Sequence, residues 1–419
     1  MPRIVRNTLL NYISTDFATE QIINPLRIFE LNNKPIRNGE IVYLCERDIR
    51  AKDNFALQKS EELNLPLKII HPKINYDYQQ KQEFIDNQIE QAKTLFRNIG
   101  LDFEIIEKTP HEIIKNINPA ILIIDFNPIL KRDYLKNVDF KIYEVDSHNS
   151  VPARFVSDKK EYSATTLRTK IYHNIYPFLT EYVNLTSSKV EADYVLEDFI
   201  NNKLQDYTEN KNNPSLDVTS GLSKYLNLGF ISSQRVALEV VKSVVNDIDK
   251  EAFLEELIIR KELADNFCLY SKSFKDFSFI PSWAKMSLEN HILDIRPYLY
   301  LPQDLENAKT HDKLWNATQI QLMREGVIHC YLRMYWAKKI LEWTSTPDEA
   351  LKIAIYLNDK YAYDAPSANG YVGILWAIGG LHDRAFLDFS ITGKIRRMTY
   401  NSIKRKYDLV TYINKYVSE

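Results

Sequence analysis

The sequence has little of several features that mark particular classes of protein. Only 10 of its 419 residues are glycine and only 3 are cysteine, Cys45, Cys268 and Cys330. The cysteines form no closely spaced pair, which excludes a disulfide scaffold, and we expect all three to be reduced core residues. An apolar run of membrane-spanning length and a signal-peptide pattern are also lacking. The sequence therefore favours a cytoplasmic protein without a membrane contact.

The sequence also lacks an excess of charge of either sign. The 54 Lys and Arg residues nearly balance the 56 Asp and Glu residues, and the net charge is −2. The molecule as a whole therefore has no electrostatic attraction to nucleic acid, and any basic surface has to be local. The eight histidines show no metal-ligand spacing, so we expect no metal site. The chain is long enough to bury a large core and form two domains.

Strand-like and helix-like patterns alternate over residues 1–150. Apolar runs predict strands at 40–45, 67–71, 102–106, 120–125 and 140–145, and apolar periodicity predicts helices at 53–63, 79–99 and 110–117. This alternation is typical of a parallel, Rossmann-like sheet covered on both faces, with residues 1–38 packed around it. No Gly-rich dinucleotide loop and no Walker loop follows these strands, so the α/β domain shows no nucleotide fingerprint.

The chain beyond residue 150 shows no strand pattern. We expect a connection at 151–190 and a larger all-α domain at 191–419. The stretch 310–344 predicts two helices joined near Gly326 and holds three of the five tryptophans, Trp315, Trp336 and Trp343. Trp336 and Trp343 stand seven residues apart, so they share one helix face about 10 Å apart along the axis. The indoles either form a buried aromatic core or relay electrons beside a redox cofactor.

Six stretches together resemble the signature of class II cyclobutane pyrimidine dimer DNA photolyases, within the photolyase/cryptochrome family. The first, SGLSKYLNLGFISSQR, covers 220–235, and the others lie at 255–268, 310–344, 355–361, 369–383 and 393–408. They match in order and spacing, and ERDIRAKDNFAL at 46–57 extends the resemblance into the first domain. The resemblance implies FAD in the all-α domain and light-driven repair of pyrimidine dimers in UV-damaged DNA. It also implies a monomer located with the DNA, which is nuclear in a eukaryote.

The resemblance assigns residues to the FAD. The loop Thr219–Ser223 would hold the pyrophosphate, although Ser and Thr before a helix are ordinarily caps. Arg260 would face the phosphates, or else pair with Glu256 on the surface. Asn358 would face N5 of the ring, or else cap a helix. The flavin-binding set is Tyr207, Thr219, Ser220, Gly221, Leu222, Ser223, Arg260, Arg333, Asn358 and Asp364, in which Arg333 and Asp364 would form an ion pair.

The sequence departs from the family pattern near this loop. Lys224 stands where Pro is usual and Leu228 where Phe is usual. Lys211 replaces an Arg that pairs in relatives with the equivalent of Asp383, and a Lys cannot make that pair bidentate. We expect a looser loop with FAD binding retained. The first domain would hold an antenna chromophore, a deazaflavin or a folate, or would be an empty structural domain.

The resemblance also assigns the chemistry. Glu256 would donate a hydrogen bond to a dimer carbonyl, which requires a protonated carboxyl in a dry site, and Met334 and Trp376 would line the pocket. Together with Asn358 these form the catalytic set. Electrons would pass along the flavin, Trp336, Trp315 and Trp343, in that order. DNA would bind the basic stretch 393–406 through Lys394, Arg396, Arg397, Lys404 and Arg405, which is otherwise a solvated face.

Other functions stay open from the sequence. A cryptochrome-like photoreceptor would keep FAD and lose repair, and it would often carry a long C-terminal tail. The chain stops shortly after the basic stretch and keeps Glu256, Met334 and Trp376, which favours the enzyme. A (6-4) photolyase is the weaker third reading, because no active-site His pair is found. Without flavin, the first domain would suit a nucleotidyltransferase-like binding protein.

Overall fold

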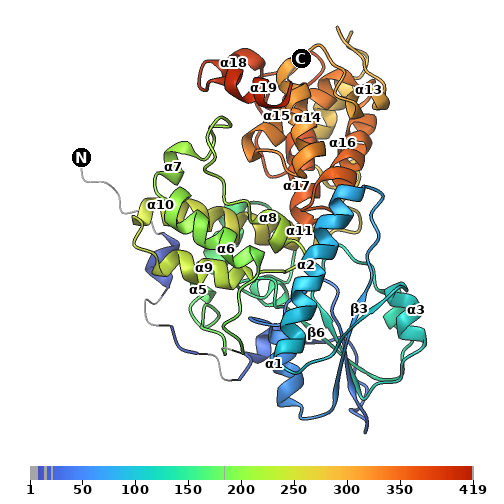
Figure 1. The fold of residues 1–419 in the computed structure, drawn as a ribbon. Helices are drawn as coiled ribbons and strands as arrows, with labels where there is room; N and C mark the ends of the chain where they lie inside the picture. Colours follow the sequence, from blue (N-terminus) through green and yellow to red (C-terminus); the bar gives the residue numbers. More distant parts are fainter. Residues whose placement is uncertain (1–7, 14–16, 20–21, 184, 418–419) are drawn as a thin grey trace. The chain divides into compact units, whose positions relative to one another are not determined.

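The computed structural model describes residues 8–13, 17–19, 22–183 and 185–417. The chain forms two compact units, the first made of Met1–Tyr76, Gln82–Gln205 and Ser220–Asn266, and the second of Asp77–Lys81, Asp206–Thr219 and Phe267–Glu419. Unit 1 contains the sheet and the first helices, and unit 2 is helical (Figure 1). The last strand ends at Val145 and the next helix begins at Ala153, and the compact units divide at positions other than 150 and 190.

Six strands form one sheet in unit 1, and five of them confirm the strands expected from the sequence. Their order is β1-β6-β5-β2-β3-β4, and every neighbouring pair is parallel except β1 with β6. The sequence missed the antiparallel edge strand β1, because its three residues are too few to show alternation. The strands are β1 (Ile28–Glu30), β2 (Ile41–Leu44), β3 (Leu67–Pro72), β4 (Phe103–Ile106), β5 (Ile121–Asp125) and β6 (Lys141–Val145).

The described part of the first 269 residues also contains eleven α-helices and several shorter helical turns. Two segments, η4 (Phe199–Lys203) and η5 (Glu255–Arg260), are π-helical turns, a form often found at functional sites. The α-helices are α1 (Phe55–Glu62), α2 (Gln79–Asn98), α3 (Pro110–Lys115), α4 (Ala153–Val156), α5 (Ala164–Asn174), α6 (Glu191–Asp198), α7 (Tyr207–Asn210), α8 (Ser223–Leu226), α9 (Ser233–Lys242), α10 (Asp247–Leu254) and α11 (Lys261–Leu269). Short 3-10 turns lie at η1 (Leu9–Tyr12), η2 (Pro25–Arg27) and η3 (Asp133–Leu135).

Helices cover both faces of the sheet, as the buried strands require. Val42 and Leu44 of β2 pack in one apolar cluster with Ile113 and Ile114 of α3. Helices α1 and α2 lie on the opposite face (Figure 1). There Phe96 of α2 stacks on Phe103 of β4 with ring centroids 4.7 Å apart. The predicted Rossmann-like α/β architecture is confirmed.

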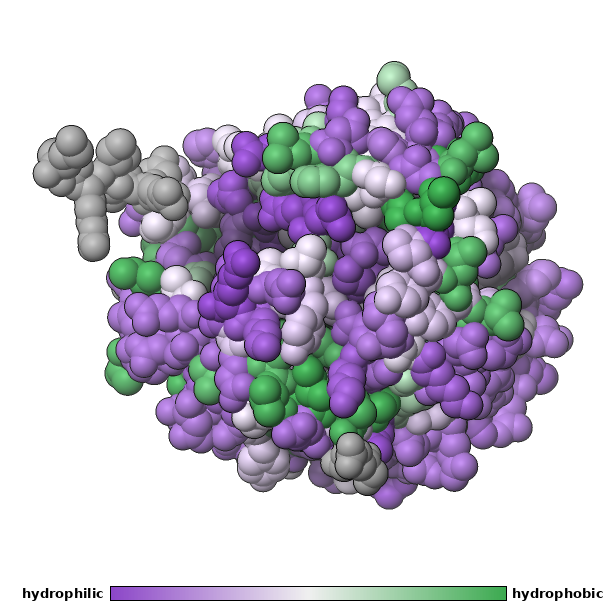
Figure 2. All heavy atoms as spheres, turned by 90° about the horizontal axis from the view of Figure 1, so that it is seen from above, coloured by the Kyte–Doolittle hydropathy of each residue, from purple (hydrophilic) through white to green (hydrophobic). Residues whose placement is uncertain are grey.

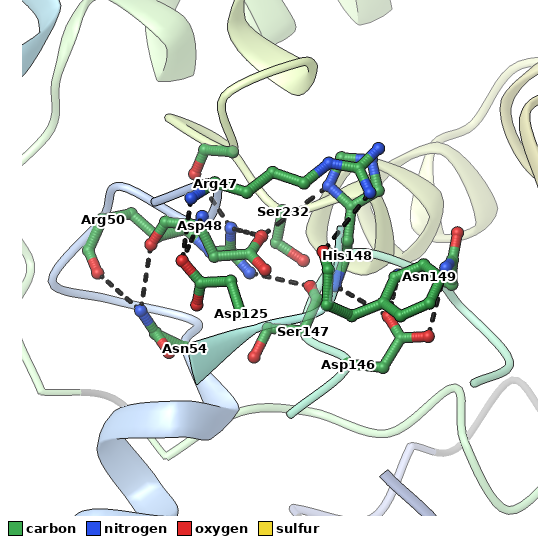
Figure 3. A network of polar contacts seen from close by, with 12 residues as sticks. Arg47, Asp48, Arg50, Asn54, Asp125, Asp146, Ser147, His148, Asn149 and Ser232 are labelled. Atoms are coloured by element: carbon green, nitrogen blue, oxygen red, sulfur yellow. Dashed lines mark hydrogen bonds and ion pairs between the residues drawn. The ribbon is translucent and has the colours of Figure 1, made fainter. Parts of the chain in front are cut away.

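A buried polar network fills the carboxyl edge of the sheet (Figure 3). The Asp125 carboxylate at the end of β5 accepts hydrogen bonds from the amides of Glu46, Arg47 and Asp48, at 2.8, 2.8 and 3.0 Å. The Tyr43 hydroxyl donates to the same carboxylate at 2.6 Å. Burial raises the pKa of Asp125 to about 6. Ligands of open α/β sheets bind where strand order reverses, here between β2 and β5, and the chain's own carboxylate occupies that place.

The same network explains the motif at 46–57. The Arg50 guanidinium donates to Asp48 at 2.6 Å, to the Ser147 carbonyl at 2.8 Å and to the Gly229 carbonyl at 2.9 Å. Arg50 is buried, so each donor needs a partner of this kind. A Cβ on Gly229 would lie 2.6 Å from the Arg47 carbonyl oxygen, so only glycine lets the chain approach so closely. In unit 1 this motif therefore has a structural role, because Arg50 joins the segments of Asp48, Ser147 and Gly229 by hydrogen bonds.

Unit 2 is built around helices α14 to α17. The predicted pair of helices is confirmed as α14 and α15, which join at Gly326 with φ +67°. A Cβ there would lie 2.2 Å from the Tyr363 ring, so the turn requires glycine. The helices are α12 (Ser282–Asn290), α13 (Pro302–Glu306), α14 (Lys313–Glu325), α15 (Cys330–Trp343), α16 (Pro347–Tyr361), α17 (Ala368–Gly379), α18 (Tyr400–Lys404) and α19 (Leu409–Tyr416), with a 3-10 turn at η6 (Phe277–Phe279).

The three cysteines differ in exposure. Cys45 and Cys268 are buried as expected, whereas Cys330, the first residue of α15, is exposed.

Figure 2 shows a face on which hydrophilic side chains predominate and hydrophobic ones gather in separate patches. Within the described ranges no helix is long and apolar enough to cross a membrane.

Candidate functional site

The three tryptophans of 310–344 form one buried cluster in unit 2. Trp315 of α14 and Trp336 of α15 stack with centroids 6.5 Å apart and an interplanar angle of 3°. Trp315 also meets Trp343 of α15 edge to face, with centroids 5.6 Å apart. Trp315 thus links the two indoles of α15, and the rings follow one another as Trp336, Trp315 and Trp343.

Hydrogen bonds fix the position of these rings. The Trp315 indole N–H donates to the Trp336 carbonyl at 3.0 Å, and the Trp336 indole N–H donates to Gln319 at 2.9 Å. Asp312 caps α14 by accepting from the Trp315 amide at 3.0 Å, and it also accepts from the Tyr335 hydroxyl of α15. Both helices are therefore tied together where they carry the indoles.

Arg333 and Asp364 form the expected ion pair. The guanidinium of Arg333 in α15 lies 3.3 Å from the Asp364 carboxylate, and both side chains are partly exposed. The Tyr363 amide donates to the Gly326 carbonyl at 2.9 Å. The glycine turn between α14 and α15 thus also anchors the segment that presents Asp364 to Arg333.

Asn358 lies inside α16, three residues before the helix ends, and its side chain is buried. It does not cap the helix with its side chain, since only its backbone carbonyl accepts from the capping residue Ala362. Its Nδ2 donates to Asp359 Oδ1 at 3.2 Å. Sequence reasoning missed Asp359, although it directly follows Asn358 in the motif at 355–361.

The loop Thr219–Ser223 crosses the division between the compact units, which falls between Thr219 and Ser220. Ser223 begins α8, a helix of only four residues, so any anion site here depends on local amides and hydroxyls more than on a helix dipole. Gly221 has φ +66° and Ser223 is exposed, whereas the Leu222 side chain is buried. Tyr207 is buried at the start of α7, and the Lys211 ammonium lies 5.6 Å from the centre of its ring.

The π-helix η5 carries Glu256 and Arg260 in unit 1. Arg260 donates to Glu255 at 3.1 Å, so in the alternative of a surface ion pair the partner is Glu255 and not Glu256. The reason is the π-helical turn, in which residues five apart align. Glu255 also binds Arg168 through two hydrogen bonds, at 2.5 and 3.1 Å. Glu256 itself is exposed, so the chain alone does not give it the dry surroundings that we expected.

Met334 and Trp376 are half-buried on α15 and α17 of unit 2. Beside Trp376, the Lys338 ammonium donates to the Ala377 carbonyl at 2.8 Å, and burial lowers the pKa of Lys338 to about 8. Asp383 pairs with Arg396 at 3.4 Å, so the partner suggested by the resemblance, Lys211, is replaced by an arginine of the basic stretch.

The basic stretch of unit 2 is a row of exposed cations over an apolar anchor. Ile395, Met398 and Ile403 are buried, and they alternate with the charged residues. Arg396 and Arg397 lie over the rings of Phe386 and Phe389, with 4.5 and 4.9 Å from guanidinium carbon to ring centre. The exposed cations are Lys394, Arg396, Arg397, Lys404, Arg405 and Lys406. The stretch therefore presents a row of cations to solvent over a buried apolar anchor.

The structure thus brings together the three tryptophans and, separately, Arg333 with Asp364. Unit 2 also carries Asn358, Met334, Trp376, Tyr207, Thr219 and the basic stretch, whereas unit 1 carries Ser220–Ser223, Glu256 and Arg260. Among the residues that the structure describes, no group of three His, Cys, Asp or Glu side chains could hold a metal ion.

Comparison with known proteins shows a structural neighbour of the chain. Its fold resembles the crystal structure of a bacterial class III photolyase from Agrobacterium tumefaciens, with a TM-score of 0.68 at 16% identity, over 92% of this chain and 87% of the other. No family model matches the sequence.

Curated relatives are closer in sequence. The chain is 36% identical to a deoxyribodipyrimidine photo-lyase of Oryza sativa subsp. japonica, over 90% of this chain and 87% of the relative. It is 35% identical to the enzyme of that name from Potorous tridactylus, over 89% and 80%, and 29% identical to that from Methanothermobacter thermautotrophicus, over 94% and 98%. The chain belongs to the deoxyribodipyrimidine photo-lyase family, and it is a DNA-repair enzyme that acts on DNA.

Proposed function

We propose that the enzyme repairs cyclobutane pyrimidine dimers by light-driven electron transfer from FAD. Reduced FAD, when bound and excited by light, supplies the electron that opens the dimer. The observation that carries the proposal is the buried row of Trp336, Trp315 and Trp343, with neighbouring centroids 6.5 and 5.6 Å apart. Such a row, in which Trp336 and Trp343 share α15 with Arg333 and Trp315 of α14 stands between them, suits an electron supply to a redox cofactor. Family membership alone does not specify this supply.

The residues of unit 2 fit the ring of a flavin. Arg333 offers a partly exposed cation held by Asp364, and it suits the polar edge of the ring. None of the described residues donates a hydrogen bond to Asn358 Oδ1, so this buried amide keeps an acceptor for the ring. In unit 1, Arg260 and the exposed Ser223 would hold the phosphates, together with Ser220, Gly221 and the backbone of Leu222. Tyr207 and Thr219 of unit 2 complete the set.

Glu256 would act on the substrate. Its carboxyl would donate a hydrogen bond to a carbonyl of the dimer, and the stacked bases would supply the dry surroundings that the exposed side chain lacks in the chain alone. Met334 and Trp376 are half-buried, so each keeps apolar surface for the flipped bases. The exposed cations of the basic stretch would bind DNA phosphates without regard to sequence.

An antenna chromophore, a deazaflavin or a folate, stays a prediction for unit 1. The carboxyl edge of the sheet is closed by Asp125 and its network, so a pigment would need another surface of the unit. The absorption spectrum of the purified protein tests this directly. Flavin bands alone would indicate an empty domain, and an additional near-ultraviolet or blue band would identify a pigment.

The proposal is tested by separating binding from chemistry at Glu256. Glu256→Ala should lower the number of dimers repaired per absorbed photon several-fold in dithionite-reduced protein, because one charge-stabilising contact is lost. Glu256→Gln keeps a donor and should be mild. Binding of dimer DNA at fixed salt should change little in either variant. Asp247→Ala, which removes an exposed carboxylate of α10, is the matched control. Equal repair by Glu256→Ala and the parent would remove Glu256 from the mechanism.

We further propose that the enzyme works as a monomer that resides with the DNA. Light scattering during size-exclusion chromatography, with and without dimer DNA, tests this. A mass of one chain, 49.2 kDa, is expected for the free protein. A mass of two chains that persists on dilution would contradict it.

A further inference from the structure

Asp359 is the centre of a small polar junction in unit 2. Its Oδ1 accepts from Asn358 Nδ2 at 3.2 Å, and its Oδ2 accepts from the Tyr371 hydroxyl of α17 at 2.9 Å. The Lys275 ammonium lies 3.7 Å from the same Oδ2. The Lys81 ammonium donates to the Asp359 carbonyl at 2.7 Å. Asp359 is therefore held by side chains from three separate segments, and it holds the Asn358 amide in turn.

The junction decides which end of the Asn358 amide is free. A carboxylate only accepts hydrogen bonds, so Asp359 selects the NH2 end of the amide and leaves the oxygen end for another partner. Gly370 of α17 lies beside this NH2 end, where an added Cβ would stand only 2.9 Å from Asn358 Nδ2, so glycine leaves the room that the amide occupies. The hydrogen bond to Asp359 is therefore the contact that sets the orientation of the amide.

The partners of Asp359 keep it an acceptor. Burial, and next the Asp359 charge, raise the pKa of Tyr371, so its hydroxyl stays protonated and donates. Lys275 lies 4.7 Å from the centre of the Tyr371 ring, so one cation borders both the carboxylate and its hydroxyl partner. This arrangement stabilises the charged carboxylate, and with it the orientation of Asn358.

We propose that Asp359 is a positioning residue that fixes Asn358 with its Oδ1 toward the flavin N5 edge. The proposal rests on the FAD binding proposed above. Reduced flavin carries a proton on N5 and oxidised flavin does not. An amide oxygen held toward N5 therefore stabilises the reduced cofactor, whereas a freely turning amide can serve either form. Asp359 thus raises the reduction potential of bound FAD without touching it.

The test measures the midpoint potential of bound FAD in Asp359→Ala and in the parent. The ratio of reduced to oxidised FAD at a fixed potential should fall about tenfold in the variant, which is about 30 mV for a two-electron couple. The affinity for oxidised FAD should change less than about fivefold, since one side-chain contact is lost and the phosphate contacts are intact. Asp348→Ala, which removes an exposed carboxylate at the other end of α16, should leave the potential unchanged.

A double variant separates positioning from general stability. If Asp359 acts through Asn358, then Asp359→Ala should cause no further shift in a protein that already carries Asn358→Ala. An equal shift in both backgrounds would show a merely structural role and overturn the proposal. If Asp359→Ala does not fold, Asp359→Leu decides, because it fills the space of the carboxylate and offers no acceptor to Asn358, and an unchanged potential would overturn the proposal.

The outcomes distinguish this inference from the proposed function. A parent protein that takes up no FAD contradicts both. A parent that binds FAD, with an Asp359→Ala variant at the parental potential, contradicts the role of Asp359 alone.

Discussion

The indole rings of Trp315 and Trp336 stack with planes only 3° apart, although they stand on different helices, α14 and α15. The Trp315 indole N–H donates to the carbonyl of Trp336 itself, so the hydrogen bond and the stacking fix the same pair. Trp343 lies on the same face of α15 as Trp336, and its ring meets Trp315 edge to face. The middle ring is therefore the one on which a path through all three indoles depends.

Replacement of the middle ring should interrupt the electron supply. In Trp315→Phe, and likewise in Trp336→Phe, illumination with an external donor should reduce bound oxidised FAD much more slowly than in the parent. Phenylalanine keeps the aromatic packing but is far harder to oxidise. Repair by protein that was first reduced with dithionite should stay near the parental level. Absorbance of the flavin during illumination measures the first effect, and dimer counting measures the second.

Trp283→Phe is the control for this experiment, since Trp283 lies on α12 and takes no part in the stacked cluster. Parental photoreduction in both Trp315→Phe and Trp336→Phe would show that the electron arrives by another path.

Arg260 should contribute to FAD binding through its charge. Arg260→Ala should weaken binding by about 1.5–3 kcal/mol, the usual size of a hydrogen bond to a charged group. The matched control is Arg168→Ala, because Arg168 and Arg260 share the partner Glu255. Titration of apoprotein with FAD measures both variants. Equal losses would mean that the effect passes through Glu255 and the π-helix, and no loss in Arg260→Ala would exclude the phosphate contact.

The sequence predicted the sheet and the helices well because both are specified by patterns of neighbouring residues. The buried strands β2, β5 and β6 appear as apolar runs, and Gly326 marks the turn between two helical patterns. The edge strand β1 and the π-helix η5 could not be predicted in this way. A strand of three residues shows no period, and the register of a π-helical turn depends on packing across the fold.

The turn at Gly326 should tolerate no side chain. Gly326→Ala places a Cβ 2.2 Å from the Tyr363 ring and keeps a positive φ, whereas Gly100→Ala keeps a positive φ with nothing within 4 Å. Backbone strain should cost both variants about 1–2 kcal/mol of stability. Overpacking should cost Gly326→Ala about 1–3 kcal/mol more. Thermal or urea unfolding gives the comparison, and equal losses would contradict the packing of Tyr363 on this turn.

Glu262 should make stability depend on pH in unit 1. It is buried, its Oε1 accepts from the Ser150 amide at 2.6 Å, and burial raises its pKa to about 7. The folded state therefore holds a proton that the unfolded state has released. Its contribution to stability is complete below the unfolded pKa of about 4.5 and is lost as pH rises to about 7.

Glu262→Gln keeps an acceptor for Ser150 and cannot ionise. As pH rises from 5 to 8, the parent loses stability while its buried carboxyl ionises, and the variant does not. The difference in free energy of unfolding between variant and parent should therefore grow by on the order of 1–3 kcal/mol over this range. Unfolding curves at several pH values measure the difference. A difference that does not change with pH would show that Glu262 is ionised throughout this range.

The candidate site was predicted less completely than the fold. The resemblance indicated Arg333, Asp364 and the tryptophans, and the structure shows the ion pair and the stacked rings. The roles of Asp359 and Glu255 were missed because each acts on a neighbour, Asn358 in one case and Arg260 in the other. Such partners become visible only when side-chain contacts are known.

The most direct test of the account is dimer repair under light. Dithionite-reduced protein is mixed with DNA that contains a defined pyrimidine dimer, and intact pyrimidines are counted after illumination and after the same time in the dark. The account predicts repair that is proportional to absorbed light and absent in the dark. Persistence of the dimers in the light, in protein that holds reduced FAD and binds the DNA, would contradict it.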